Sequence, residues 1–145
     1  MKISKQLVLP VLVMVVGFGI LASAQSKKAA TAKVFFIEPK NGATVTSPVH
    51  RKFGSSGTEI SAVPAGDVTT ARPGMTHYHV GVGVTCLPPG KNIVKGTPSW
   101  VHFGDGKNEI DMQLPSGPHT LVLEIGDDLH KTQPGLCATI KDVVK

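Results

Sequence analysis

Several short runs of alternating apolar and polar residues follow residue 32, and this is the pattern of strands that bury one face. The clearest run is 75–84. Because the side chains of a strand point alternately to its two faces, one face of this run is apolar and the other carries imidazoles. The apolar face holds Tyr78, Val80, Val82 and Val84, and the second face holds His77, His79, Gly81 and Gly83. We therefore predict a strand with one core side and one side available for chemistry.

Seven further strands are expected from short apolar or alternating runs that end at Gly, Pro, Asn or Asp. These runs are 33–38, 49–53, 58–63, 100–103, 108–114, 119–125 and 138–144. The runs 108–114 and 119–125 are expected to pair as a hairpin. Since no run after the N-terminus has a helical period, we predict an all-β fold, an antiparallel immunoglobulin-like or cupredoxin-like sandwich of seven to eight strands.

The N-terminus has the composition of an export signal. Two lysines precede an apolar run over residues 7–22, and the small residues at 22–24 fit the pattern that signal peptidase cleaves. A retained membrane anchor is the alternative, and it would be the only membrane contact of the chain. The predicted location is periplasmic or secreted. The predicted organisation is a signal peptide at 1–24, a flexible arm at 25–32 and a single β-sandwich domain at 33–145.

The charge of the chain does not indicate a nucleic-acid partner. The 15 Lys and Arg exceed the 10 Asp and Glu, but two of the lysines lie in the predicted signal peptide. Others lie in or near the arm, at Lys27, Lys28, Lys33 and Lys40. The domain itself is therefore close to neutral, and it has no basic stripe interleaved with aromatic residues.

Cys86 and Cys137 are the only two cysteines. Cysteines of an exported chain usually pair, because the compartment beyond the membrane is oxidising. We predict a disulfide that closes a loop of about fifty residues. The alternative is that the two thiols are soft metal ligands, although they lack the C-x-x-C spacing.

Strand geometry limits which histidines of the domain can share a site. A strand extends about 3.3 Å per residue, so His119, at the start of the run 119–125, and His130, just beyond its end, fall at opposite ends. The predicted hairpin places His102, which leads into its first strand, at the same end as His130. The candidate metal ligands are therefore His77, His79, His102 and His130.

Neutral imidazoles suit copper, zinc or nickel, and Met75 would favour copper(I) if it joined the site. We predict a protein that binds a transition metal ion, copper before zinc, for sequestration or delivery. An exposed polar face is the alternative interpretation of the His-x-His pattern. A second hypothesis is a non-catalytic envelope scaffold or interaction module with a structural histidine network and another envelope protein as partner. No catalytic motif is present, so we do not predict an enzyme.

Several segments resemble a family of bacterial exported proteins. The resemblance rests on His102–Glu109, Leu114–Leu123 and Gly126–His130, on an opening segment like Pro39–Val45, and on a histidine-rich strand start at His77 and His79. The family is the domain of unknown function numbered forty-three ninety-nine. The resemblance covers nearly the whole chain after the predicted signal peptide, and it implies a small β-sandwich in the cell envelope. It implies no particular function.

Overall fold

Two β-sheets make up residues 31–145, the part of the chain that the computed structural model describes. The predicted signal peptide and nearly all of the predicted arm lie outside this part. The strands are β1 (Lys33–Glu38), β2 (Ala43–Val45), β3 (Val49–Ser56), β4 (Glu59–Ile60), β5 (Met75–Val82), β6 (Trp100–His102), β7 (Glu109–Met112), β8 (Gly117–Asp127) and β9 (Thr132–Val144). The described residues form no helix, and therefore none that could cross a membrane. The all-β prediction is confirmed, with nine strands in place of seven to eight.

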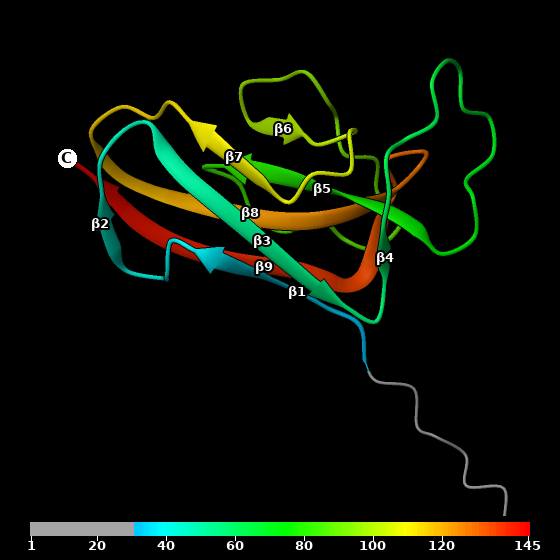
Figure 1. The fold of residues 1–145 in the computed structure, drawn as a ribbon, viewed down its shortest axis with the longest axis horizontal. Helices are drawn as coiled ribbons and strands as arrows, with labels where there is room; N and C mark the ends of the chain where they lie inside the picture. The colour runs from blue at the N-terminus through cyan, green and yellow to red at the C-terminus, as the bar shows by residue number, and fades with distance from the viewer. Residues whose placement is uncertain (1–30) are drawn as a thin grey trace, which may run out of the picture.

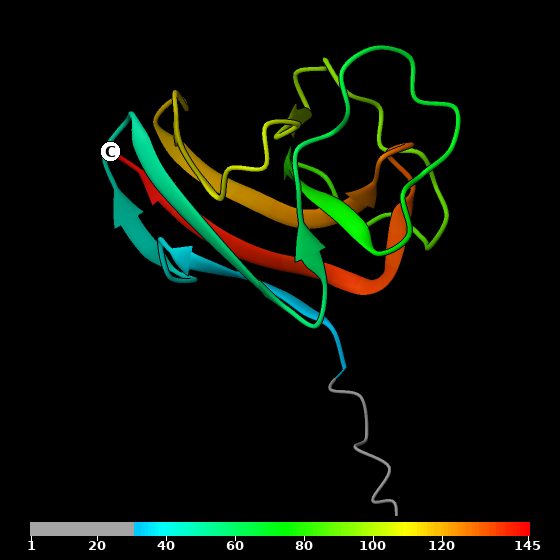
Figure 2. The ribbon, with the colours of Figure 1, turned by 45° about the vertical axis from the view of Figure 1, so that its right-hand side comes forward.

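The two sheets form the layers of a sandwich. One has the order β1-β3-β7, and the other has the order β2-β9-β8-β5-β4, with β6 paired to β5 as well. In Figures 1 and 2 the long strands β8 and β9 run the length of the domain, and β3 crosses over them. Most pairs are antiparallel, as predicted, but β2–β9 and β4–β5 are parallel. The immunoglobulin-like or cupredoxin-like character of the sandwich stays a prediction.

The prediction that 108–114 and 119–125 pair as a hairpin is wrong. Strand β7 pairs with β3, where Met112 lies opposite Val49, and β8 pairs instead with β5 and β9. The residues at the junction of β7 and β8 explain the difference. Pro115, between the strands, and Pro118, the second residue of β8, have no N–H to donate to a hairpin ladder, so the chain passes from one sheet to the other here.

An aromatic cluster fills the space between the sheets. Phe53 of β3 is fully buried, and its ring centroid lies 5.7 Å from Phe36, 5.6 Å from Tyr78 and 5.3 Å from Phe103. These are the offset and edge-to-face contacts that aromatic rings prefer. Tyr78 and Val80 bring the apolar face of β5 into this core, as the alternation along the strand predicts.

The opposite face of the larger sheet is covered as well, by residues 83–99, which we call the covering segment. A second apolar cluster of Ile93, Trp100 and Val122 lies beneath it. Val84 packs against this cluster, and not on the core face as the alternation suggests. The reason is that β5 ends at Val82, and Gly83 follows with a φ of 68°, which redirects the chain.

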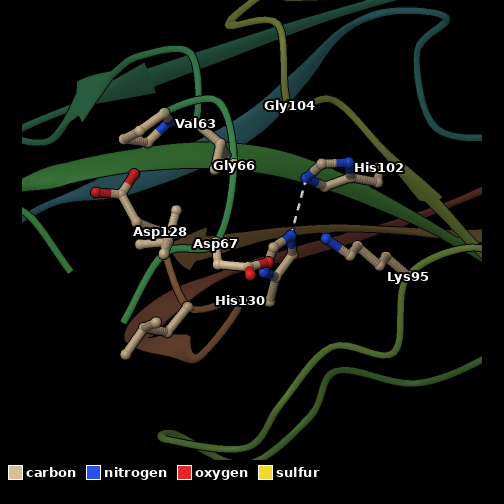
Figure 3. Close-up of a pocket in the computed structure, with 11 residues that line it drawn as sticks. Val63, Gly66, Asp67, Lys95, His102, Gly104, Asp128 and His130 are labelled. Carbon is tan, nitrogen blue, oxygen red and sulfur yellow. Dashed lines mark hydrogen bonds between the residues drawn. The ribbon is translucent and has the colours of Figure 1, made fainter. Parts of the chain in front are cut away.

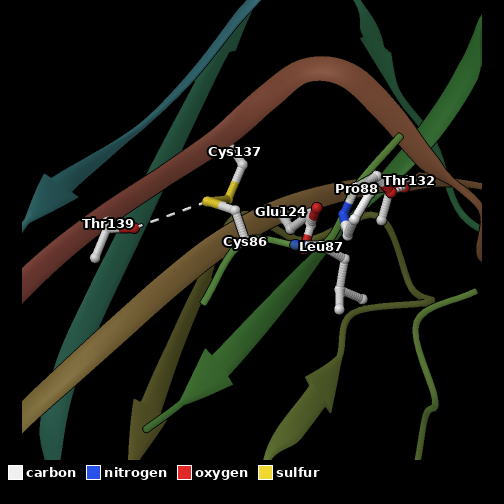
Figure 4. Close-up of a disulfide and its surroundings, with 7 residues drawn as sticks. All are labelled: Cys86, Leu87, Pro88, Glu124, Thr132, Cys137 and Thr139. Carbon is white, nitrogen blue, oxygen red and sulfur yellow. Dashed lines mark hydrogen bonds between the residues drawn. A yellow bond between two sulfur atoms is a disulfide. The ribbon is translucent and has the colours of Figure 1, made fainter. Parts of the chain in front are cut away.

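A disulfide and backbone hydrogen bonds fasten the covering segment to β9 and to the turn before it. Cys86 is bonded to Cys137 of β9, so the predicted pairing is confirmed (Figure 4). Gly90 N donates to the carbonyl of Thr132, at the start of β9, over 3.0 Å, and Ile93 N donates to the carbonyl of His130 over 2.8 Å. The segment is thus held at both its beginning and its middle.

A buried ion pair joins the two sheets near the start of β8 and the end of β9. Arg51 of β3 donates from Nη1 to Oδ2 of Asp142 on β9 over 2.8 Å, and both side chains are fully buried. Among residues 31–145, Arg51 Nε, Arg51 Nη2 and Asp142 Oδ1 have no hydrogen-bond partner. Each charge therefore depends on the other, because water does not reach either of them.

Removal of only one partner should be more harmful than removal of both. We expect Asp142→Leu to lower the free energy of unfolding by about 3–5 kcal/mol, because the Arg51 guanidinium is left buried without a counter-charge. The double variant Arg51→Met/Asp142→Leu should recover most of this loss. Urea denaturation of the three proteins measures both effects. A double variant as unstable as the single one would contradict the argument.

Candidate metal centre

His77 and His79 lie side by side on β5, on the face under the covering segment. Residues two positions apart on a strand point to the same side, and these two ring centroids are 4.4 Å apart. Both side chains are 0% exposed. The interpretation of this His-x-His pattern as an exposed polar face is therefore wrong.

Strand pairing brings His102 to these two imidazoles. Strand β6 runs antiparallel to β5, and His102 lies directly opposite His79. Its ring centroid is 4.9 Å from that of His77 and 5.2 Å from that of His79. The sequence predicts this neighbourhood for a different reason, a hairpin that does not form. The pairing of β6 with β5 is the actual cause.

The turn between β8 and β9 supplies His130. Gly126, near the end of β8, lies opposite His77, so the turn follows beside the imidazoles. His130 has a φ of 63°, in the left-handed region that costs about 1–2 kcal/mol for a residue with a Cβ. Its Nε2 lies 3.0 Å from Nε2 of His102. Strained backbone of this kind gathers at ligand-binding positions.

The four predicted histidines thus meet at one point. Each offers a ring nitrogen, and these four nitrogens all lie within 4.8 Å of one another. Nitrogens that bind one tetrahedral ion through bonds of 2.0–2.1 Å lie about 3.3 Å apart. Small side-chain movements would therefore be enough for all four imidazoles to reach a common ion.

The two buried imidazoles lack the hydrogen bonds that such groups normally make. A neutral imidazole carries one N–H donor and one acceptor nitrogen. Within the described residues, neither ring nitrogen of His77 or of His79 has a partner. An unpaired buried polar group costs about 1–3 kcal/mol, and native structures contain few of them. These four ring nitrogens therefore lack a hydrogen-bond partner among the described residues.

Burial keeps these imidazoles neutral. Desolvation, together with the neighbouring imidazoles, lowers the pKa of His77 to about 3 and the pKa of His79 to about 2. Desolvation also lowers the pKa of His102 and of His130. At neutral pH each ring consequently keeps a lone pair, which is the form that binds metal ions.

Two glycines provide the space that the imidazoles occupy. A Cβ on Gly126 would lie 2.9 Å from Cε1 of His79, and a Cβ on Gly104 would collide with the ring of His102. Neither glycine has a positive φ. Their missing side chains, and not their backbone freedom, therefore fit them to these positions.

Two aspartates hold the turn that carries the fourth histidine. Asp127 Oδ1 accepts hydrogen bonds from the backbone N–H groups of Leu129 and Lys131, at 2.9 and 3.0 Å. This is a common role of aspartate in turns. Asp128 accepts from Nε and the backbone N–H of Arg72, at 2.8 and 2.9 Å. These bonds lower the pKa of Asp128 to about 2.

The two histidines left out of the predicted site lie away from the cluster. His119 is opposite Asp142, at the far end of β8, where its Nε2 lies 2.7 Å from the carbonyl oxygen of Pro115. His50 is an exposed residue of β3, and its Nδ1 lies 2.9 Å from a carboxylate oxygen of Asp111. Both therefore have local partners of their own.

Sequence reasoning missed Glu124, which lies opposite His79 on β8. The residue is 1% exposed, and its Oε2 accepts a hydrogen bond from the N–H of Leu87 over 3.2 Å. Burial raises the pKa of this carboxyl. The signal in the sequence is a single acid inside the apolar run 121–125.

A cavity of about 440 Å³ opens next to the cluster (Figure 3). Its walls come from the loop between β4 and β5, from the covering segment and from the β8–β9 turn. The polar residues that line it are Asp67, Lys95, His102, Asp128 and His130. Two of the four imidazoles are thus buried, and the other two face a cavity.

Acid should destabilise the ion-free protein through the two buried imidazoles. Unfolding returns them to an ordinary pKa near 6.5, while the folded values are about 3 and 2. Between pH 6.5 and about 3 the unfolded chain therefore binds protons that the folded chain excludes, so stability falls as pH falls. We expect a loss of about 1 kcal/mol per pH unit for each imidazole.

Urea denaturation from pH 7 to pH 5 measures this loss. The variant His77→Leu/His79→Leu should show a flatter dependence on pH, whereas His119→Gln, which changes a histidine outside the cluster, should keep the slope of the parent protein. Equal slopes in all three proteins would contradict the assignment.

Comparison with known proteins identifies a family but no characterised relative. The family described as Domain of unknown function (DUF4399) matches residues 51–144, which include all four clustered histidines. No curated protein and no solved structure matches the chain. The chain belongs to the DUF4399 family.

Proposed function

We propose that this protein binds a transition metal ion, copper before zinc, in the periplasm or outside the cell, and that it sequesters or delivers the ion. The observation that carries the proposal is the set of four unpartnered ring nitrogens of His77 and His79. They lie next to two further imidazoles, within reach of a single ion.

The energetic cost of the buried imidazoles supports an ion as their partner over a purely structural role. Two fully buried imidazoles without hydrogen bonds destabilise the folded chain. An ion would give each of them a strong partner through one nitrogen. The left-handed backbone at His130 adds a further cost that bonding to an ion would offset.

The ligand chemistry supports copper before zinc. Imidazole binds both ions, and copper(II) stands above zinc in the general order of affinity for nitrogen ligands. Met75 belongs to the same side of β5 as His77 by strand parity. Its thioether would add a preference for copper(I) if it reached the ion.

Two features support an exported location. The first 24 residues have the composition of a signal peptide. The disulfide between Cys86 and Cys137 suits an oxidising compartment, since cytosolic thiols are kept reduced.

One contact favours a second function, an envelope scaffold or interaction module with a structural histidine network. His102 and His130 lie in hydrogen-bonding geometry, with Nε2 atoms 3.0 Å apart. Such a network would satisfy these two rings and position the β8–β9 turn. It leaves His77 and His79 without partners, and for this reason we rank it second.

Metal titration tests the first proposal. Metal-free protein at pH 7 should bind Cu²⁺, and more weakly Zn²⁺, with a Kd tighter than about 10 μM. The double variant His77→Ala/His79→Ala should lose at least tenfold in affinity, because two of the four nitrogens are gone. Isothermal titration calorimetry measures both values.

The matched control is His50→Ala/His119→Ala, which removes the same number of imidazoles outside the cluster. It should bind copper like the parent protein. Circular dichroism establishes that both double variants are folded. Parent binding weaker than 10 μM, or equal binding by the two double variants, would refute the proposal.

Thermal unfolding separates the two functions. A bound ion stabilises only the folded state, so copper in hundredfold excess over its Kd should add about 2.7 kcal/mol, and a chelator should reverse the gain in Tm. A structural network predicts no effect of copper or chelator on the Tm of the parent. It also predicts a loss of about 1–3 kcal/mol in the metal-free variant His130→Ala.

A further inference from the structure

The cavity beside the cluster reaches the two imidazoles that the covering segment leaves partly open. His102 and His130 both line it, whereas His77 and His79 lie behind them and are fully buried. An ion held by the cluster would therefore meet protein on one side and the cavity on the other. The cavity is the route by which a further molecule could reach the ion.

With a divalent ion bound, positive charge would exceed negative charge around this open side. Four neutral imidazoles leave the charge of a divalent ion uncompensated, and the cluster contains no carboxylate. Lys95 of the covering segment lines the same cavity, and Figure 3 shows its ammonium group directed toward the pair His102 and His130. Among residues 31–145 no carboxylate forms an ion pair with Lys95.

The two acids of the cavity offset only part of this charge. Asp128 is bound to Arg72 by Nε and by Nη2, at 2.8 and 2.9 Å, and is therefore already neutralised. Asp67 is an exposed residue of the β4–β5 loop, and its carboxylate is not part of the ligand cluster. A free anion can thus approach between Lys95 and the ion.

We propose that the cavity binds a small anion, of the size and kind of a short carboxylate, which bonds to the metal ion and is held by the Lys95 ammonium group. The inference rests on the proposed metal site. A volume of about 440 Å³ exceeds the needs of a single water molecule. The apolar part of the wall, which would take the hydrocarbon portion of such an anion, consists of Val63, Pro64, Val68 and Leu129.

Azide is a suitable probe, because a small anion bonded to copper(II) gives a charge-transfer absorption band. Addition of azide to the copper-loaded protein should produce this band with saturable dependence on concentration. The variant Lys95→Gln should weaken azide binding about fivefold, as expected for the loss of one nearby charge. Acetate should compete with azide for the same position.

Lys91→Gln is the matched control. It removes an exposed lysine of the same covering segment that does not line the cavity, and it should leave the affinity for azide unchanged. Both lysine variants should bind copper at least as tightly as the parent protein, because neither residue is a ligand. Their copper affinity thus verifies that the site is intact.

The outcomes distinguish the two proposals. Absence of copper binding by the parent protein overturns the metal site and this inference with it. Copper binding without an azide band overturns the inference alone. Equal azide affinity in the Lys95→Gln and Lys91→Gln proteins also overturns it, since the anion would then not be held by Lys95.

Discussion

The attachment of the covering segment to the larger sheet is the constraint on which the histidine cluster depends. The covering segment, together with β6 and the β8–β9 turn, covers the face of β5 that carries His77 and His79. The disulfide to Cys137 and the backbone bonds to the β8–β9 turn hold the segment over that face. Burial of the two imidazoles lowers their pKa values and leaves their nitrogens without a partner among the described residues.

Buried charged and polar groups are accommodated differently at the two ends of the sandwich. At one end Arg51 and Asp142 neutralise each other between the sheets. At the other end His77 and His79 are kept neutral by desolvation, burial raises the pKa of Glu124, and the buried Asp128 is paired with Arg72. Within the described residues both ends retain buried polar atoms without a hydrogen-bond partner, on the ion pair at the first end and on the two imidazoles at the second.

Local pattern predicted the strands well, because alternation and turn residues act over a few positions. The core face of β5 followed from such rules, whereas the pairing of Cys86 with Cys137 followed from the cysteine count and the predicted export. Sheet membership did not, since the apolar faces of β7 and β8 suit either a hairpin or two facing layers equally well. Prolines between these strands were the available clue.

The membership of the cluster was predicted, but its environment was not. Strand length placed His130 at one end of the sandwich, and the predicted hairpin, which does not form, placed His102 at the same end. The covering segment carries no regular pattern, so its position over His79 could not be inferred from its sequence. The role proposed for Lys95 depends on that position, whereas the role of Gly126 depends on the pairing of β8 with β5.

Because the histidines lie far apart in the sequence, the unfolded polypeptide cannot bring all four to a single ion. His79, His102 and His130 are more than twenty residues apart, and they meet through long-range strand pairing, which forms slowly. A chain threaded through a membrane in extended form would present at most the pair at 77 and 79. Under the proposed export and metal binding, such a chain would leave the cell interior without an ion and would acquire one only after it folds outside.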